Sequence, residues 1–172
     1  MKKFVVCGYK ESGKTTLIKK VIQNYDKSVV GFYTKKFENR LTEDGLCPIY
    51  IYDINSDAVL DDEHLIGLGG EGTHYTNVEV FDNVGVELIS TDDKTSLIAI
   101  DEIGFLENEA KVFQEKVFEI LESENPVVMI IKQRMQFSFL KRLKEFPGIE
   151  YIELTLDNRD EVCDHIIKEL KK

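Results

Sequence analysis

The sequence predicts an α/β fold with three layers, in which helices cover both faces of a mostly parallel sheet. Three observations lead to this prediction. Segments with helical apolar spacing alternate along the chain with short apolar runs. Residues 4–7, 15–25 and 29–34 read as strand, helix and strand within about thirty residues, the length of a βαβ unit with parallel strands. The runs 97–100 and 127–131 are apolar throughout, which is typical of strands buried on both faces.

Length and composition limit what the chain does. Its 172 residues suffice for one buried core and are few for two, so we expect one domain over residues 1–172. The net charge of −10 argues against broad nucleic-acid binding and against anionic membranes. The 3 cysteines have neither disulfide-framework nor zinc spacing, and the first apolar run is too short for a membrane span. We expect a cytoplasmic protein with no nucleic-acid or membrane partner.

The pattern is less regular after the second strand. Residues 37–53, with a polar turn at 41–45, are expected to form a β-hairpin excursion. Residues 56–77 carry the glycine-rich stretch 67–72, which suggests a second phosphate-binding loop. Because no helical pattern follows these glycines, a mobile surface loop is the favoured expectation. Residues 78–90 fit either a short strand or a helix.

The C-terminal half alternates clearly. We expect strands over 96–102, 126–131 and 149–156, and helices over 108–122, 137–146 and 159–170. The strand 96–102 ends in two carboxylates, which suggests that its carboxyl end opens into a site.

The first site motif is the loop between the first strand and helix. Residues 8–15 fit G-x-x-x-x-G-K-[ST], the phosphate-binding P-loop, without substitution. Its glycines let the backbone approach phosphate oxygens, while N–H groups and the start of the helix attract the anion. Lys14 supplies a charge for the β- and γ-phosphates, and Thr15 is placed to hold Mg²⁺. We expect a nucleoside triphosphate to bind Gly8, Tyr9, Lys10, Glu11, Ser12, Gly13, Lys14, Thr15 and Thr16.

The second site motif is the carboxylate pair Asp101 and Glu102. Four apolar residues followed by Asp form the Walker B pattern, whose carboxylate holds Mg²⁺, often through water. The adjacent Glu102 is suited to orient the attacking water. A solvated pair at a strand end is the alternative, and the P-loop on the same sheet favours the functional interpretation.

Four segments together resemble the THEP1-type P-loop nucleoside-triphosphatases, a family related to the human cancer-related nucleoside-triphosphatase. They are residues 8–16, Gly31-Phe32-Tyr33-Thr34, Asp101-Glu102-Ile103-Gly104 and Asn158-Arg159-Asp160, and the likeness extends over nearly the full chain. The resemblance implies a RecA-like fold and hydrolysis of the terminal phosphate of ATP, GTP and other nucleoside triphosphates. It implies metal support by Asp101, catalysis by Glu102, and a place near the nucleoside for Asn158 and Arg159.

The chain departs from the family pattern in its basic residues. Lys35, Lys36 and Phe37 stand where the family tends to have an acidic residue and an arginine, and the 67–72 stretch lacks basic groups. Arg134 follows the strand 126–131 at the sheet edge where ligands bind, so it is a candidate catalytic cation. A plain polar loop over 132–134 is the equal alternative.

Two other functions stay open. The P-loop region looks like that of a nucleotide-binding adaptor of the MobB type, the GTP-binding partner in molybdopterin cofactor assembly, which would need a protein partner. A small-molecule kinase would need an acceptor pocket and an arginine-bearing lid, and the loops are poor in arginine. The intact Asp101–Glu102 pair favours hydrolysis, with Mg²⁺ as cofactor and no readable base preference.

Overall fold

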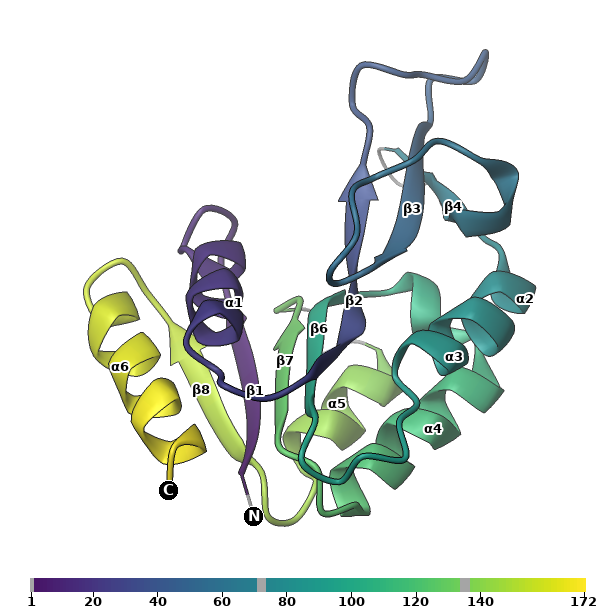
Figure 1. Ribbon diagram of the computed structural model, residues 1–172. Helices are drawn as coiled ribbons and strands as arrows, with labels where there is room; N and C mark the ends of the chain where they lie inside the picture. Colours follow the sequence, from purple (N-terminus) through teal and green to yellow (C-terminus); the bar gives the residue numbers. More distant parts are fainter. Residues whose placement is uncertain (1, 71–73, 134–136) are drawn as a thin grey trace.

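The computed structural model describes residues 2–70, 74–133 and 137–172. Within them the strands form one sheet with the order β5-β4-β3-β2-β6-β7-β1-β8 (Figure 1). Their bounds are β1 Lys3–Gly8, β2 Val29–Lys36, β3 Cys47–Asp53, β4 Leu65–Gly69, β5 His74–Thr76, β6 Leu97–Ile103, β7 Val127–Ile131 and β8 Glu150–Leu154. The neighbours β2, β6, β7, β1 and β8 are parallel, and β3, β4 and β5 add an antiparallel meander at one end. The predicted mostly parallel sheet is confirmed.

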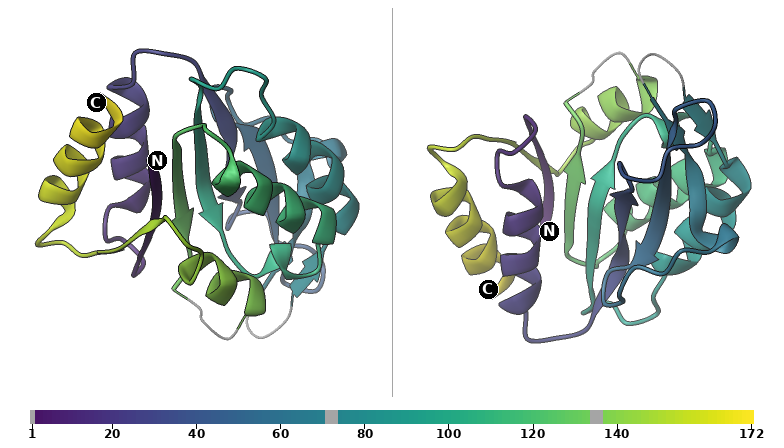
Figure 2. Two further views of the ribbon diagram at one scale, coloured as in Figure 1. Left: turned by 90° about the horizontal axis from the view of Figure 1, so that it is seen from below. Right: turned by 90° about the horizontal axis from the view of Figure 1, so that it is seen from above.

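Helices cover both faces of the sheet (Figure 2). Their bounds are α1 Lys14–Gln23, α2 Val78–Val80, α3 Val86–Leu88, α4 Lys111–Glu122, α5 Ser138–Lys144 and α6 Arg159–Leu170, with short turns at η1 Asp62–His64, η2 Phe81–Gly85 and η3 Leu106–Asn108. Alternate residues of β1 enter different cores: Phe4 and Val6 lie in the cluster with α1 and α6, whereas Val5 and Cys7 lie in the cluster with α4 and α5. This alternation produces the three layers predicted from the sequence.

The expected antiparallel excursion is present, but it does not begin at Phe37: β2 continues to Lys36 and pairs antiparallel with β3, leaving residues 37–46 as the connection. The expectation for residues 56–77 was wrong. Within 56–77, the expected loop contains η1 and the strands β4 and β5. Gly67 allows the close pairing, since a Cβ there would lie 2.3 Å from the Tyr75 backbone oxygen.

The segment with two possible interpretations is helical. Residues 78–88 run through α2, the π-helical turn η2 and α3, and Phe81 in the middle is fully buried. In the C-terminal half the expected helices and strands are present, with ends shifted by a few residues. The peptide bond between Asp101 and Glu102 is cis.

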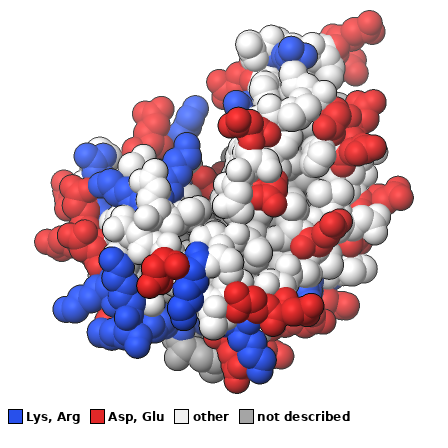
Figure 3. Space-filling view, in the orientation of Figure 1, with Lys and Arg blue, Asp and Glu red and all other residues white. Residues whose placement is uncertain are grey.

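Charge is unevenly spread over the surface. In Figure 3 the Lys and Arg side chains gather on the side of α1 and α6, whereas Asp and Glu predominate over the helices α2 to α4 and over the antiparallel strands. None of the helices in the described ranges is both long enough and apolar enough to cross a membrane.

Candidate active site

The P-loop connects the end of β1 to the start of α1, as predicted. Gly13 takes a φ of 97°, a left-handed conformation that suits glycine, directly before the first helical residue Lys14. At Gly8 there is no room for a side chain, because a Cβ would lie 2.6 Å from the Leu154 backbone oxygen. Both glycines of the motif are therefore required by the local backbone, and the amino end of α1 faces the loop.

Lys14 lies folded over its own loop. Its Nζ donates hydrogen bonds to the backbone oxygens of Gly8, at 2.9 Å, and Tyr9, at 2.8 Å. These carbonyls hold the ammonium at the position where phosphate oxygens of a nucleotide are expected. A bound phosphate would replace them as the partner of Lys14.

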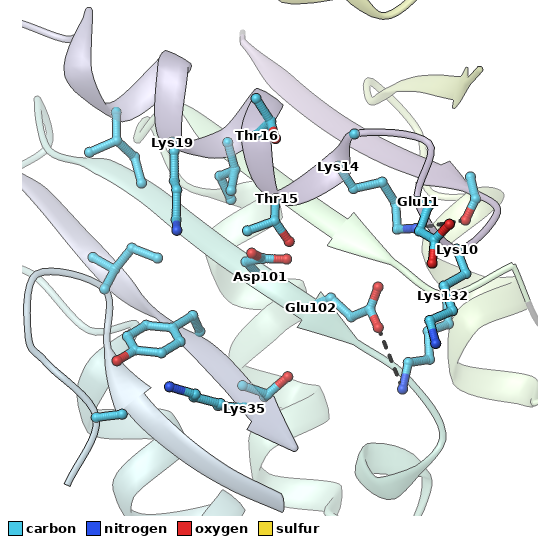
Figure 4. Close-up of a pocket in the computed structure, with 18 of the residues that line it drawn as sticks. Lys10, Glu11, Lys14, Thr15, Thr16, Lys19, Lys35, Asp101, Glu102 and Lys132 are labelled. Atoms are coloured by element: carbon cyan, nitrogen blue, oxygen red, sulfur yellow. Dashed lines mark hydrogen bonds and ion pairs between the residues drawn. The ribbon is translucent and has the colours of Figure 1, made fainter. Parts of the chain in front are cut away.

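Thr15 and Asp101 face each other across the loop and the end of β6 (Figure 4). The Thr15 hydroxyl hydrogen-bonds the Asp101 carboxylate, which is 9% exposed. Burial raises the pKa of Asp101 to about 6; the Thr15 hydrogen bond opposes this shift and the charge of Glu102 adds to it. The two side chains thus offer a hydroxyl and a carboxylate in one place.

This donor set fits Mg²⁺. Magnesium prefers oxygen ligands and keeps several waters and substrate phosphates in its shell rather than a full protein cage. The described part of the chain has no group of three or more His, Cys, Asp or Glu side chains able to hold a metal alone. Thr15 and Asp101 would therefore hold the ion together with the phosphates of a nucleotide.

Glu102 points into the same pocket and forms an ion pair with Lys132. The distance from Lys132 Nζ to Glu102 Oε1 is 3.4 Å, and the two side chains are 39% and 23% exposed. Glu102 is thus half-buried, close to the P-loop and open to water, as an activating carboxylate requires.

The pocket has a volume of about 1720 Å³. It is lined by the P-loop, the first turns of α1, the end of β2, residues 54–58 and the carboxyl ends of β6 and β7 (Figure 4). Its cationic lining residues are Lys10, Lys14, Lys19, Lys35, Lys132 and Arg159. Two of these lysines were not predicted as site residues. Lys19 follows Thr15 by one helical turn, and Lys132 directly follows β7.

The structure brings most of the predicted nucleotide-binding residues together. Of the residues 8–16, all but Ser12 line the pocket; Ser12 is buried, and its hydroxyl has no hydrogen-bond partner within the described residues. Arg159 lines the pocket, whereas Asn158 closes the turn before α6, its Nδ2 donating to the Glu153 backbone oxygen at 2.9 Å. Arg134 lies outside the residues that the structure describes.

Glu107, which was not predicted as a site residue, is a carboxylate buried beside the site. Its Oε2 accepts a hydrogen bond from the Gly104 backbone N–H at 2.9 Å, so it fixes the turn that follows β6. Burial raises the pKa of Glu107 to about 7, and hydrogen bonds and the charge of Lys132 oppose this shift. The acidic residue three positions after Gly104 was the only signal in the sequence.

Comparison with known proteins agrees with this geometry. The family described as NTPase matches residues 3–167. The chain belongs to this NTPase family. It is 27% identical over 177 residues to the nucleoside-triphosphatase THEP1 of Aquifex aeolicus, covering 99% of both chains. It is 32% identical over 173 residues to that of Thermotoga petrophila, covering 98% of this chain and 93% of the relative.

Solved structures show the same fold for this NTPase. The crystal structure of THEP1 from Aquifex aeolicus superimposes with a TM-score of 0.75 at 26% identity, covering 99% of both chains. The solution structure of a human cancer-related nucleoside triphosphatase, at 16% identity, gives a TM-score of 0.71 over 99% of this chain and 98% of that one, which is a likeness of fold. The predicted family, P-loop fold and class of enzyme are confirmed.

Proposed function

We propose that residues 1–172 act as one domain that hydrolyses nucleoside triphosphates, ATP and GTP among them, to the diphosphate and phosphate with Mg²⁺ as cofactor. One observation carries the proposal. Thr15, Asp101 and Glu102 lie in the pocket that begins at an intact P-loop. Phosphate binding, metal binding and water activation therefore have their groups in one place.

Each group of residues has a separate role in the proposed hydrolysis. The N–H groups of the P-loop and Lys14 bind the phosphates, and Lys14 exchanges the carbonyls of Gly8 and Tyr9 for phosphate oxygens. Thr15 and Asp101 would hold Mg²⁺, which neutralises phosphate charge when bound. Glu102 orients the water and accepts its proton as the oxygen attacks the γ-phosphorus and the bond to the diphosphate breaks.

Arg159 lines the pocket at the start of α6 and is proposed to contact the nucleoside, with no preference among bases. We place the protein in the cytoplasm, in accord with three cysteines that are all free and buried. The acidic surface supports the absence of a nucleic-acid or membrane partner.

The test is phosphate release from ATP, GTP, CTP and UTP with Mg²⁺. We expect turnover of several of them by the wild type, binding without turnover by Glu102→Gln, with kcat lower by about 100-fold or more, and loss of binding by Lys14→Ala. Lys116→Ala is the matched control, because Lys116 lies on α4 paired with Glu119 at 3.2 Å, away from the pocket.

Two outcomes would contradict the proposal. A wild type that binds one nucleotide tightly and releases no phosphate above the Lys14→Ala background is an adaptor of the kind considered from the sequence. Transfer of labelled γ-phosphate to an acceptor other than water would identify a kinase.

A further inference from the structure

The register of the sheet places one lysine between the two halves of the site. β7 lies between β1 and β6; its last residue, Ile131, pairs with Cys7 on one side and Ile103 on the other. The next residue is Lys132, whose backbone N–H donates to the Ile103 oxygen at 2.8 Å. Lys132 therefore leaves the sheet between the beginning of the P-loop and the Asp101-Glu102-Ile103-Gly104 segment.

The side chain of Lys132 is held along a defined path. Its Nζ lies 3.4 Å from Glu102 Oε1 (Figure 4). It lies 5.3 Å from the centre of the Phe105 ring. Its aliphatic stem passes over Gly104, where a Cβ would come within 3.0 Å of Lys132 Cδ. The charge of Lys132 also acts on the buried carboxylate of Glu107. Groups from the segment after β6 thus direct the ammonium into the pocket.

Stability does not explain this arrangement. The Lys132–Glu102 pair is partly exposed, and such pairs contribute little because water screens them. Among the described residues, Lys132 is the only cation of the pocket lining in an ion pair with Glu102. Lys35 instead lies 5.0 Å from the Phe37 ring, and Lys14 binds the P-loop carbonyls.

We propose that Lys132 is the catalytic cation that stabilises the transferring phosphoryl group and that, before nucleotide binds, it holds Glu102 in an ion pair. When the γ-phosphate enters, Nζ moves from Glu102 Oε1 to phosphate oxygens and releases the carboxylate to receive water. The water oxygen then bonds to phosphorus, the bond to the diphosphate oxygen breaks, and Glu102 takes the proton while Lys132 stays protonated. Charge on the phosphoryl oxygens is then met by the Lys132 ammonium, which already lies in the pocket.

The inference rests on the proposed hydrolysis, and the test separates the two. Lys132→Met keeps the apolar stem and removes the charge, so kcat should fall by about 100-fold or more. The Kd of a non-hydrolysable ATP analogue with Mg²⁺ should change by about threefold or less, because in the wild type the contact of Nζ with phosphate only replaces its ion pair with Glu102. Lys132→Arg should recover most of the activity. The matched control is Lys94→Met, since Lys94 forms an exposed pair with Glu124 at 2.8 Å outside the pocket and should leave kcat unchanged.

A second variant, at Gly104, perturbs Lys132 from the segment that follows β6. Gly104→Ala should displace the Lys132 stem and lower kcat, and the double variant with Lys132→Met should be no slower than Lys132→Met alone, because both changes remove one interaction. Additive losses in kcat would contradict the proposal, as would a folded Lys132→Met with wild-type kcat. If Lys132→Met does not fold, Lys132→Arg and Gly104→Ala decide. A wild type that hydrolyses no nucleotide overturns the proposed function, and this inference with it.

Discussion

At the scale of the residue, the buried carboxyl of Glu107, in the turn after β6, makes the stability of the fold depend on pH. The residue is 2% exposed, and burial raises the pKa of its carboxyl from 4.5 to about 7. The folded state therefore binds more protons than the unfolded state between these values, and the free energy of unfolding falls as pH rises through this window. A difference of this size corresponds to about 3 kcal/mol when the group is fully ionised.

We therefore predict that Glu107→Gln flattens the pH dependence of stability. The amide oxygen still accepts from Gly104 but does not ionise, so the variant should match the wild type near pH 5 and exceed it by about 2–3 kcal/mol at pH 8. Urea unfolding at several pH values measures this difference. Glu119→Gln, at a side chain 67% exposed on α4, is the control and should follow the wild type. Parallel curves for Glu107→Gln and the wild type would contradict the burial argument.

Single residues of the site were predictable where their chemistry is local in sequence. The P-loop and the Asp101–Glu102 pair are short runs whose residue types and spacing predict their role. The structure places both in one pocket. Lys132 and Glu107 lack such a signal, because their roles depend on partners supplied by another strand or by burial. Arg134 was predicted from its place after the strand 126–131 and lies outside the described residues, whereas the register of β7 shows what Lys132 faces.

At the scale of the element, Gly31 joins the parallel and antiparallel parts of the sheet. It has a φ of 136°, and a Cβ there would lie 1.8 Å from the Ala99 backbone oxygen in β6. Gly31→Ala should separate β2 from β6 and cost about 3 kcal/mol or more of stability. Gly45→Ala is the control: φ is 75° with no described atom within 4 Å of a Cβ, so the cost should be about 1–2 kcal/mol.

The urea midpoints of the two variants measure this difference, and equal shifts would show that the close approach to β6 costs nothing. The buried strands β6 and β7 were predictable, since the runs 97–100 and 127–131 within them are apolar throughout. The short strands β4 and β5 were missed because they are glycine-rich or brief and acquire their structure by pairing outward from β3.

At the scale of the whole molecule, an acidic protein carries a cationic pocket. The net charge is −10, yet six Lys and Arg side chains and only four Asp and Glu side chains line the pocket, and Figure 3 shows basic residues gathered on the side of α1 and α6. Local attraction must therefore outweigh the repulsion that the rest of the surface exerts on a nucleoside triphosphate. Such attraction acts over the Debye length, about 10 Å at 0.1 M salt and 3 Å at 1 M.

We predict that nucleotide affinity falls with salt and that this fall depends on lysines beyond the P-loop. The Kd of a non-hydrolysable ATP analogue with Mg²⁺ should rise by about three- to tenfold between 0.05 and 0.5 M NaCl. Lys19→Gln and Lys35→Gln remove charge from the pocket lining and should weaken the dependence, whereas Lys116→Gln on α4 should not. Removing Mg²⁺ with EDTA should weaken binding at every salt concentration, since Thr15 and Asp101 would then face the phosphates without the ion. A Kd that ignores salt would mean that backbone hydrogen bonds of the P-loop, rather than charge, determine affinity.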